Sequence, residues 1–397
     1  MISRVSVVTM LRKVLRTVVT VSFLPFAAAL WILRIRFFWI TNLDRIGHLA
    51  AEPDAYLKQS RMGMLGPHLG IFVAPLTGTV NQSLLALWTN ILPSVTNPKI
   101  VRLLFVFWRF RFLWIDSKQY VAADFGQPAT YYEILSRWEG RSPIIRTPQV
   151  LAEKGRAVLA RLGLPADAWF VCLHVREAGY SPRDDQLHEY RNCSIENYWE
   201  AVEEVVGRGG WCIRMGDGST TPLRFHPRVI DYAHSPECCD WMDIFLCAEC
   251  RLFLGTTSGL IMVPTIFGRR TVTTNFVPIS RPPVSPSGLG IPKLLQEKET
   301  GRLLTFEEVV QGEGTMSYTN LNSIPGIAIL ENRPEEIRQA VAEALDELDG
   351  KIIFEEPDIR RQERFLSIYP EGHFASKAKS RISPSFLRKY EALLPPG

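Results

Sequence analysis

Small polar and charged residues follow three short apolar runs in the second half of the chain, at 169–175, 211–215 and 251–254. Ligands of open α/β sheets bind beyond the carboxyl ends of the strands, so these positions are the first candidates for chemistry. Small residues that open a helix expose backbone amides and hydroxyls, which hold a phosphate with help from the helix dipole. The positions at or just after the ends of these runs are His174, Arg176, Glu177, Arg214, Gly216, Asp217, Thr256, Thr257, Ser258 and Gly259.

Two arginines at the same predicted edge favour a ligand with two phosphates. The guanidinium groups of Arg176 and Arg214 can each bind a phosphate through two hydrogen bonds, whereas a helix terminus alone would bind it weakly. Each feature also has an ordinary explanation: a helix cap for the small residues, a surface ion pair for an arginine, a core position for His174. Because all of these residues are expected at the same edge of the sheet, a site for a nucleotide diphosphate is favoured.

The stretch after 169–175 adds four more polar candidates, Asp184, Asp185, Arg191 and Asn192. Transfer to a hydroxyl group benefits from a base, and the candidates are Glu177, Asp184 and Asp185, among which the sequence does not choose. Asn275 ends a further apolar run, next to a segment at 278–292 that is rich in proline and glycine. We expect this segment to be an irregular loop and a candidate lid.

The elements that position these residues alternate between short apolar runs and amphipathic helices, which indicates an α/β fold with mainly parallel strands. With 397 residues, 46% of them hydrophobic, the chain can bury two cores. A glycine and a proline near residue 163 precede the clearest strand, so we expect a domain boundary there. In the second half we expect strands at 169–175, 211–215, 228–231, 251–254 and 271–274, and helices at 194–206 with Ser194 as N-cap, 240–248 and 258–267. Elsewhere we expect strands or buried segments at 46–49, 70–74 and 99–106, and helices at 81–92, 148–162, 334–348 and 385–394.

An uncharged segment at 17–33 lies between basic residues, and its length is at the short limit for crossing a bilayer about 30 Å thick. Pro25 interrupts the helix, so a helix lying in the membrane interface competes with a single span. A signal peptide is disfavoured, because it would need a cleavage site of small residues and residues 31–39 do not provide one. A buried helix of a soluble protein fits the length of the segment less well. The flanking basic residues are Arg12, Lys13, Arg16, Arg34 and Arg36. The aromatic residues expected at the acyl boundary are Phe23, Trp31, Phe37, Phe38 and Trp39.

Charge and cysteine usage exclude some classes of function. The net charge of +4 is small and, beyond the N-terminal stretch, dispersed, so no nucleic-acid partner is expected. Seven cysteines at irregular positions indicate buried, reduced thiols in a cytosolic environment rather than disulfides. Cys247 and Cys250 form a CxxC pair near Cys238 and Cys239, but no second pair follows at zinc-finger spacing, which favours core packing over metal.

At these residues the chain resembles the fucosyltransferase-like branch of GT-B glycosyltransferases. That branch has an HxRxxD-type motif after the first strand of its C-terminal domain, and this chain has His-Val-Arg-Glu-Ala-Gly-Tyr at 174–180. The chain has no acidic residue at the Asp position of this motif, and the nearest carboxylates are Glu177, Asp184 and Asp185. The later Asp-Ile-Phe-Leu at 243–246, followed by Thr-Ser-Gly at 257–259, is similar to a second motif of the branch. This likeness covers roughly residues 169–275.

Over nearly the whole chain, the sequence is similar to a bacterial family of glycosyltransferases found with surface-polysaccharide genes. The matching segments are 45–49, the HVR at 174–176 with Arg191 and Asn192, RMGD at 214–217, SGL at 258–260 and ISPSFL at 382–387. The resemblance implies a GT-B fold with two Rossmann-like, doubly wound domains that face a cleft. The expected parts are a membrane-associated helix at 1–40, an acceptor domain at 41–165, a nucleotide-sugar domain at 166–375, and a helix at 376–397 that returns to the first domain.

The resemblance also implies roles for single residues. Arg176 would hold the β-phosphate of the donor, Ser258 and its neighbours would complete the diphosphate cradle, and Asp217 or Asp243 would contact the nucleotide or order the loops. The acceptor would face Arg45, Gly47 and His48. Such an enzyme works without a bound metal or cofactor, because arginines and helix dipoles stabilise the leaving diphosphate.

The expected activity is transfer of a sugar from a nucleotide-diphosphate sugar, with GDP-sugars among the candidates, to a glycan or lipid-linked acceptor. The expected location is the cytoplasmic face of the bacterial inner membrane. A non-hydrolysing sugar-nucleotide epimerase is an alternative that needs carboxylates and a histidine around the sugar. A membrane-bound protein that binds sugar nucleotides or glycans without catalysis is a second alternative. An oxidoreductase is disfavoured because no GxGxxG follows a strand.

Overall fold

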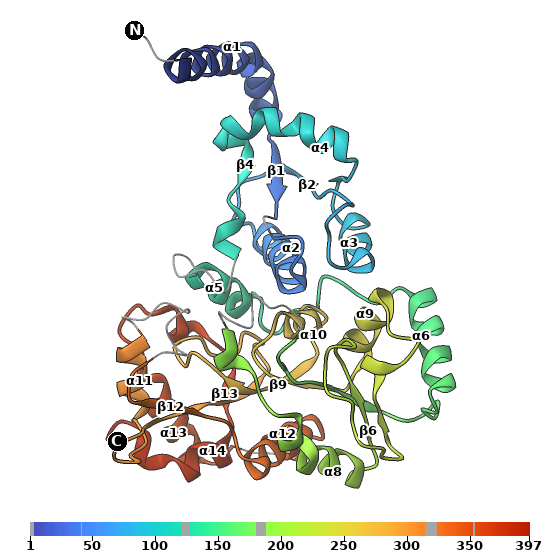
Figure 1. Cartoon of the computed structure of the whole chain (residues 1–397), viewed down its shortest axis with the longest axis vertical. Helices are drawn as coiled ribbons and strands as arrows, with labels where there is room; N and C mark the ends of the chain where they lie inside the picture. The colour runs from blue at the N-terminus through green and yellow to red at the C-terminus, as the bar shows by residue number, and fades with distance from the viewer. Residues whose placement is uncertain (1–3, 41, 121–127, 180–187, 314–323, 352–353) are drawn as a thin grey trace.

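The computed structural model describes residues 4–40, 42–120, 128–179, 188–313, 324–351 and 354–397, and every structural statement below concerns these residues. The chain forms two α/β domains, each built on a parallel sheet (Figure 1). A short antiparallel pair, β11 (Leu294–Glu297) and β12 (Ile327–Leu330), is added in the second half. The α/β architecture with mainly parallel strands, as expected from the sequence, is therefore confirmed.

The N-terminal sheet has four parallel strands in the order β3-β2-β1-β4. Its central strand β1 is an apolar run because helices cover both faces, and Phe37 and Phe38 are only 3% and 0% exposed. The strands are β1 (Ile35–Trp39), β2 (Leu69–Val73), β3 (Ser94–Val95) and β4 (Trp114–Ile115). The helices of this half are α1 (Arg4–Ile32), α2 (Ile46–Arg61), α3 (Gln82–Thr89), α4 (Pro98–Leu104) and α5 (Pro128–Trp138).

The C-terminal sheet has seven strands in the order β13-β10-β9-β8-β5-β6-β7, and every pairing in it is parallel. Its strands are β5 (Phe170–His174), β6 (Trp211–Arg214), β7 (Val229–Ile230), β8 (Leu252–Gly255), β9 (Arg270–Phe276), β10 (Leu289–Pro292) and β13 (Arg381–Ile382). Its helices are α6 (Gln149–Arg161), α8 (Trp199–Gly207), α9 (Asp240–Glu249), α10 (Met262–Ile266), α11 (Phe306–Glu313), α12 (Pro334–Leu348), α13 (Glu356–Leu366) and α14 (Pro384–Lys389).

Both sheets share one winding pattern. In each, the first strand along the chain is flanked by the second strand on one side and the fourth on the other. The winding therefore reverses between β1 and β4 in the first sheet and between β5 and β8 in the second. In doubly wound sheets such a reversal opens a crevice beyond the carboxyl ends of the strands, where ligands bind. Figure 1 shows the β1 arrow pointing toward the C-terminal domain, so the carboxyl ends of the first sheet face the second domain.

The two domains are joined by a continuous apolar core. Helix α2 packs on α10, and α3 packs on α9, so side chains from both halves belong to the same buried cluster. The closest approach is between Gly47 in the first turn of α2 and Gly259 after β8. A Cβ atom on Gly47 would lie 2.9 Å from the Cα of Gly259, which is closer than side chains tolerate. Glycine at this position lets the two loops meet.

Several expected elements are present. The segment 70–74 corresponds to β2, and α3 begins after Asn81, whose side chain accepts a hydrogen bond from the Leu84 backbone amide. The expected helix at 148–162 is α6, and the expected strands of the second half are β5 to β9. Ser194 caps a short 3-10 helix, η5 (Ile195–Tyr198), which leads into α8.

Three predictions for the first half were wrong. The segments 46–49 and 99–106 were expected as strands or buried segments, and most of their residues are not buried. The first is the opening turn of α2, and the second forms α4 and the 3-10 helix η1 (Phe105–Arg109). The segment 35–39, assigned to the membrane region, is the central strand β1, so Phe37 and Phe38 lie in the protein core. A short apolar run does not distinguish strand, buried helix and membrane contact by periodicity, because each buries all of its side chains.

The expected domain limits also need correction. Helix α6, assigned to the N-terminal domain, packs on α9, and Arg161 pairs with Glu237 at 2.7 Å, so α6 belongs with the C-terminal domain. Helix α14 does not return to the first domain but packs on α12 and α13. The contact with the first domain comes from η9 (Phe374–Lys377), which packs on α5 and forms a 3.1 Å ion pair between Lys377 and Glu133.

Helix α1 is continuous through Pro25 and packs against the N-terminal domain near its C-terminal end, where Ala27 is fully buried. Within the described part of the chain, no helix combines the length and the apolar character that crossing a bilayer requires.

The glycine contact between the domains gives a stability prediction. We expect Gly47→Ala to lower the free energy of unfolding by about 1–3 kcal/mol, because the added methyl group meets backbone rather than a side chain that can turn away. Gly66→Ala is the matched control, since a Cβ atom there meets nothing within 4 Å. Urea denaturation of both variants measures the difference; equal stability would show that the domains are not held in this contact.

Candidate functional site

The loops that leave β5 and β8 are tied together at the crevice of the C-terminal sheet. The Arg176 backbone amide donates to Thr256 Oγ1 at 3.0 Å, and the Thr256 amide donates to the His174 carbonyl at 3.1 Å. His174 Nδ1 and Ser258 Oγ share a hydrogen bond of 3.2 Å. The Thr257 hydroxyl is shielded from solvent and, among the described residues, has no hydrogen-bond partner. These residues therefore come together as the sequence predicted.

His174 is a neutral group with cationic neighbours. Burial, reinforced by the charges of Arg214 and Arg176, lowers the pKa of His174 to about 4. The imidazole is therefore uncharged near neutral pH, and it acts as a hydrogen-bond partner for Ser258 instead of as a cation. The positive charge at this edge comes from the arginines.

Arg214 is fully buried and already paired within the protein. Its guanidinium bonds to Glu177 at 2.7 Å and to Asp231 at 3.3 Å. Glu177 also accepts from the Thr221 backbone amide at 3.2 Å. These contacts favour a structural role, in which Arg214 joins the loops after β5, β6 and β7, over the predicted phosphate clamp. They also occupy Glu177, which makes it a poor base.

Gly216, Asp217 and Asp243 lie on the loop after β6 and on the first turn of α9. Asp217 accepts from the Ser219 backbone amide at 2.9 Å and thereby shapes its own turn. Gly216 has a φ of 141°, which explains the glycine. Asp243 accepts from the Tyr232 hydroxyl at 2.8 Å, and burial raises the pKa of Asp243 to about 7. Asp243 thus favours loop ordering over nucleotide contact.

The remaining donor candidates divide into two groups. Arg191 and Asn192 stay close to the crevice, because the amide of the next residue, Cys193, donates to the Arg176 carbonyl at 2.9 Å. Asn275 is fully buried, and its side chain bonds to the Tyr198 hydroxyl and to the Asn332 backbone amide. Asn275 is therefore a core residue. Asp184 and Asp185 lie outside the described residues.

The segment at 278–292 is not a lid. It ends in β10, and most of its residues are buried. Three hydroxyl groups donate to its carbonyls: Tyr369 to Ile279, Tyr132 to Pro282 and Ser380 to Pro283. Its prolines and glycines suit a packed, irregular connection, and composition alone did not separate that from a surface loop.

The acceptor candidates lie at the crevice of the N-terminal sheet. Arg45 precedes α2, Gly47 touches Gly259, and His48 follows in the same turn. His48 Nδ1 bonds to Glu52 Oε1 at 2.6 Å, and Glu52 is only 1% exposed. Burial raises the pKa of Glu52 against the opposing effect of His48. The sequence reasoning missed Glu52, although the spacing of four residues places it on the same helix face as His48.

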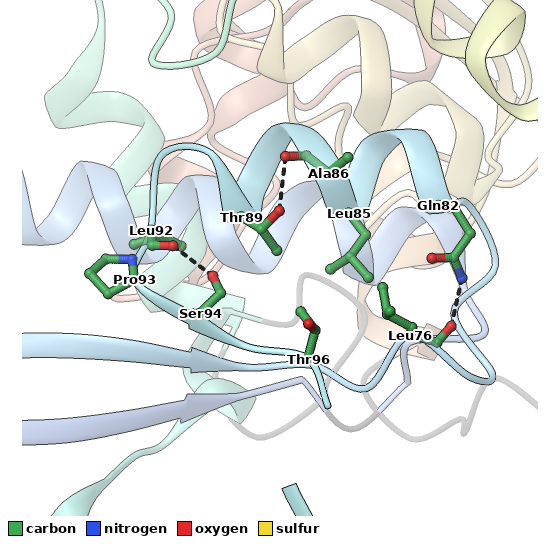
Figure 2. Close-up of a pocket in the computed structure, with 9 residues that line it drawn as sticks. All are labelled: Leu76, Gln82, Leu85, Ala86, Thr89, Leu92, Pro93, Ser94 and Thr96. Carbon is green, nitrogen blue, oxygen red and sulfur yellow. Dashed lines mark hydrogen bonds between the residues drawn. The ribbon is translucent and has the colours of Figure 1, made fainter. Parts of the chain in front are cut away.

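A separate cavity of about 300 Å³ lies beside α3 at the β3 edge of the N-terminal sheet (Figure 2). It contains none of the predicted site residues and no charged side chain. Its polar groups are turned to nearby carbonyls: Gln82 to Leu76, Thr89 to Ala86 and Ser94 to Leu92. It therefore lacks the charge that a diphosphate requires.

No protein-family model matches the chain, and no curated protein matches it significantly. Among solved structures, the glycosyl transferase family 9 protein of Veillonella parvula DSM 2008 aligns with 79% of this chain and 98% of its own, at 11% identity and a TM-score of 0.45. The E. coli ADP-heptose LPS heptosyltransferase II aligns with 79% of this chain and 98% of its own, at 12% identity and a TM-score of 0.43. The heptosyltransferase TibC aligns with 80% of this chain and 76% of its own, at 12% identity and a TM-score of 0.38. These scores are too low to carry an argument, so the function must rest on the site.

The raised pKa of Asp243 predicts that the free energy of unfolding depends on pH. An unfolded aspartate ionises near pH ~4, so between about pH 4 and pH 7 only the unfolded chain loses this proton, and stability falls as pH rises through that window. We expect Asp243→Asn to be more stable than the wild type by about 2–4 kcal/mol above pH ~7 and equal to it below pH ~4. Urea denaturation across this range measures it. The exposed Asp167→Asn is the control, and a constant difference at all pH values would contradict the prediction.

Proposed function

We propose that this chain is a glycosyltransferase that moves a sugar from a nucleotide-diphosphate sugar to a glycan or lipid-linked acceptor of a bacterial surface polysaccharide. The observation that carries this proposal is the meeting of two sheet crevices, with the Gly47 backbone against Gly259. The C-terminal crevice offers hydroxyls, backbone amides and an arginine, which suit a diphosphate. The N-terminal crevice offers a histidine held by a carboxylate, which suits an attacking hydroxyl.

On the donor side, Arg176 is the proposed phosphate-binding cation. Of the two arginines expected to clamp a phosphate, Arg214 is neutralised by Glu177 and Asp231, whereas the Arg176 backbone is joined to Thr256 at the crevice. The Thr257 hydroxyl and the small residues after it line the same loop. As the bond between the sugar and the phosphate breaks, negative charge grows on the leaving nucleoside diphosphate. A fixed guanidinium stabilises that charge without help from a metal.

On the acceptor side, His48 is the proposed base. Its Nδ1 is bonded to buried Glu52, which orients the ring and leaves Nε2 as the other nitrogen. In the proposed step, Nε2 takes the proton of the acceptor hydroxyl while the oxygen attacks the anomeric carbon, and the diphosphate leaves with the bonding electron pair. The carboxylate then stabilises the imidazolium, as in other histidine and carboxylate pairs.

The alternatives meet specific difficulties. An epimerase needs free carboxylates around the sugar, and the described candidate Glu177 is engaged by Arg214. Release of free nucleotide only when an acceptor is present would argue against an epimerase. A binding protein without catalysis would bind the sugar nucleotide and release none with any acceptor. The proposed location is the cytoplasmic face of the inner membrane, supported by seven cysteines that are all free thiols.

The donor site is tested by thermal stabilisation of the purified protein with GDP-, UDP-, CMP- and dTDP-sugars. We expect a shift with one nucleotide class, and we expect Arg176→Ala to abolish it because the main phosphate cation is lost. The same variant should lower kcat/KM by about 100-fold or more. Arg156→Ala, at an exposed position of α6, is the matched control and should keep the shift. A shift of full size in Arg176→Ala would remove this residue from the site.

The acceptor base is tested separately. We expect His48→Asn to lower kcat by about 100-fold while the donor-induced thermal shift stays, because proton removal and donor binding use different residues. Glu52→Gln should lower kcat less and change its pH profile, since the ring keeps a hydrogen bond but loses the charge behind it. The pH dependence of kcat checks both variants. Unchanged kcat in His48→Asn would show that another group accepts the proton.

A further inference from the structure

Exposed hydrophobic side chains gather at one end of the N-terminal domain. Figure 1 shows α1 and α4 at the end of this domain that is remote from the C-terminal domain. We call the outer faces of α1 from residue 18 and of residues 99–112 the distal surface. Phe26 is 64% exposed, Ile32 76% and Leu103 60%, and Trp31 and Phe112 are exposed as well. Elsewhere in the described chain, exposed large hydrophobic residues are scattered, so this cluster indicates a contact surface.

Contacts between the two segments make the distal surface one unit. The Phe23 ring packs edge-on against Phe107, with centroids 5.6 Å apart, and Trp31 packs edge-on against Phe112 at 5.3 Å. Arg109 Nη1 donates to Thr20 Oγ1 at 3.0 Å. Helix α1 is therefore held on the domain by these contacts, and its outward face and that of α4 are presented together.

The part of the chain that carries the distal surface is rich in basic residues. Residues 1–115 contain 13 Lys and Arg against three Asp and Glu, whereas the rest of the chain contains 32 against 38. Of the three acidic residues, Glu52 and Asp54 are buried, and Asp44 lies next to α2 at the opposite, carboxyl end of the sheet. The exposed cations on the surface include Lys99 and Arg102, and exposed Arg34 follows directly after α1.

Two arginines also lie over tryptophan rings. The guanidinium carbon of Arg36 is 3.7 Å from the Trp31 ring centroid, and that of Arg111 is 4.6 Å from Trp108. Tryptophan rings prefer the level of lipid headgroups, where arginine can reach phosphate while its stem covers apolar surface. Aromatic residues paired with arginine, beside exposed aliphatic residues, are the features expected of a protein face that enters a membrane interface.

We propose that the distal surface docks on a membrane that contains anionic phospholipid, with α1 and α4 both in the interface. Apolar side chains would enter the acyl boundary, and the basic residues would meet lipid phosphates. A second copy of the chain is the other apolar partner of this kind, but two such surfaces would bring like charges together, which is unfavourable. Docking by α4 adds a second contact segment to the N-terminal helix, and it does not depend on the proposed transfer reaction.

The test is sedimentation of the purified full chain with vesicles of phosphatidylcholine alone and of phosphatidylcholine mixed with phosphatidylglycerol. We expect binding to the mixed vesicles that weakens as salt rises. Lys99→Glu with Arg102→Glu should weaken it at least about tenfold, since each basic residue near an anionic surface adds to the attraction. Ile100→Gln with Leu103→Gln should weaken binding to a similar degree, because the exposed apolar groups of α4 no longer enter the interface.

Matched controls lie outside the distal surface. Arg146→Glu with Arg156→Glu makes the same charge change, and Val150→Gln with Phe225→Gln removes two side chains that are 76% and 92% exposed. Both controls should bind vesicles like the wild type. The α4 variants should keep the sugar-nucleotide thermal shift, so loss of docking is distinguished from loss of the donor site. Equal binding by the α4 variants, no binding by the wild type, or a dimer that the α4 variants dissociate would each overturn the proposal.

Discussion

The position of α2 between the two halves is the constraint on which the rest of the structure depends. This helix is buried from Leu49 through Gln59, including three charged side chains. Lys58 and Asp54 form an ion pair at 2.5 Å, which offsets part of the cost of taking the two charges out of water. Because α2 packs on α10, its first turn is carried against the loop after β8, and glycine there lets the backbones meet. The relative position of the carboxyl ends of the two sheets follows from this packing.

Paired charges hold the loops of the site, and the pairing decides which groups remain for chemistry. Arg214 is buried with two carboxylate partners, so its charge would lose its compensation in a dry environment only if both were removed. Such a group fixes three loops but has little left to offer a substrate. The neutral His174 likewise supports Ser258 instead of adding charge. Under the proposed function, the positive charge for a diphosphate would come from Arg176, with Arg191 close to the same crevice.

The sequence predicted the C-terminal half better than the N-terminal half for a physical reason. Strands β5 and β8 are buried on both faces and end in small or charged residues. The end of each apolar run and the start of the polar loop therefore locate the same edge of the sheet in the sequence. In the first half, β1 follows an apolar helix without a clear break, and α2 is buried on all sides, so neither shows a period. Contacts between distant residues, such as Arg214 with Asp231 and Asn275 with Asn332, leave no local pattern at all.

The two proposals together fix a geometry for the acceptor. Strand β1 runs from the end of α1 toward the turn that carries Gly47 and His48, and its five residues span roughly 17 Å at ~3.3 Å per residue. A chain docked by its distal surface would hold the crevices at least about that far from the headgroups. A lipid-linked acceptor would then need a headgroup of several sugar or phosphate units to present its hydroxyl to His48. A short lipid-linked acceptor would stop below the site, so the same strand that joins docking surface and crevice would also select acceptors by length.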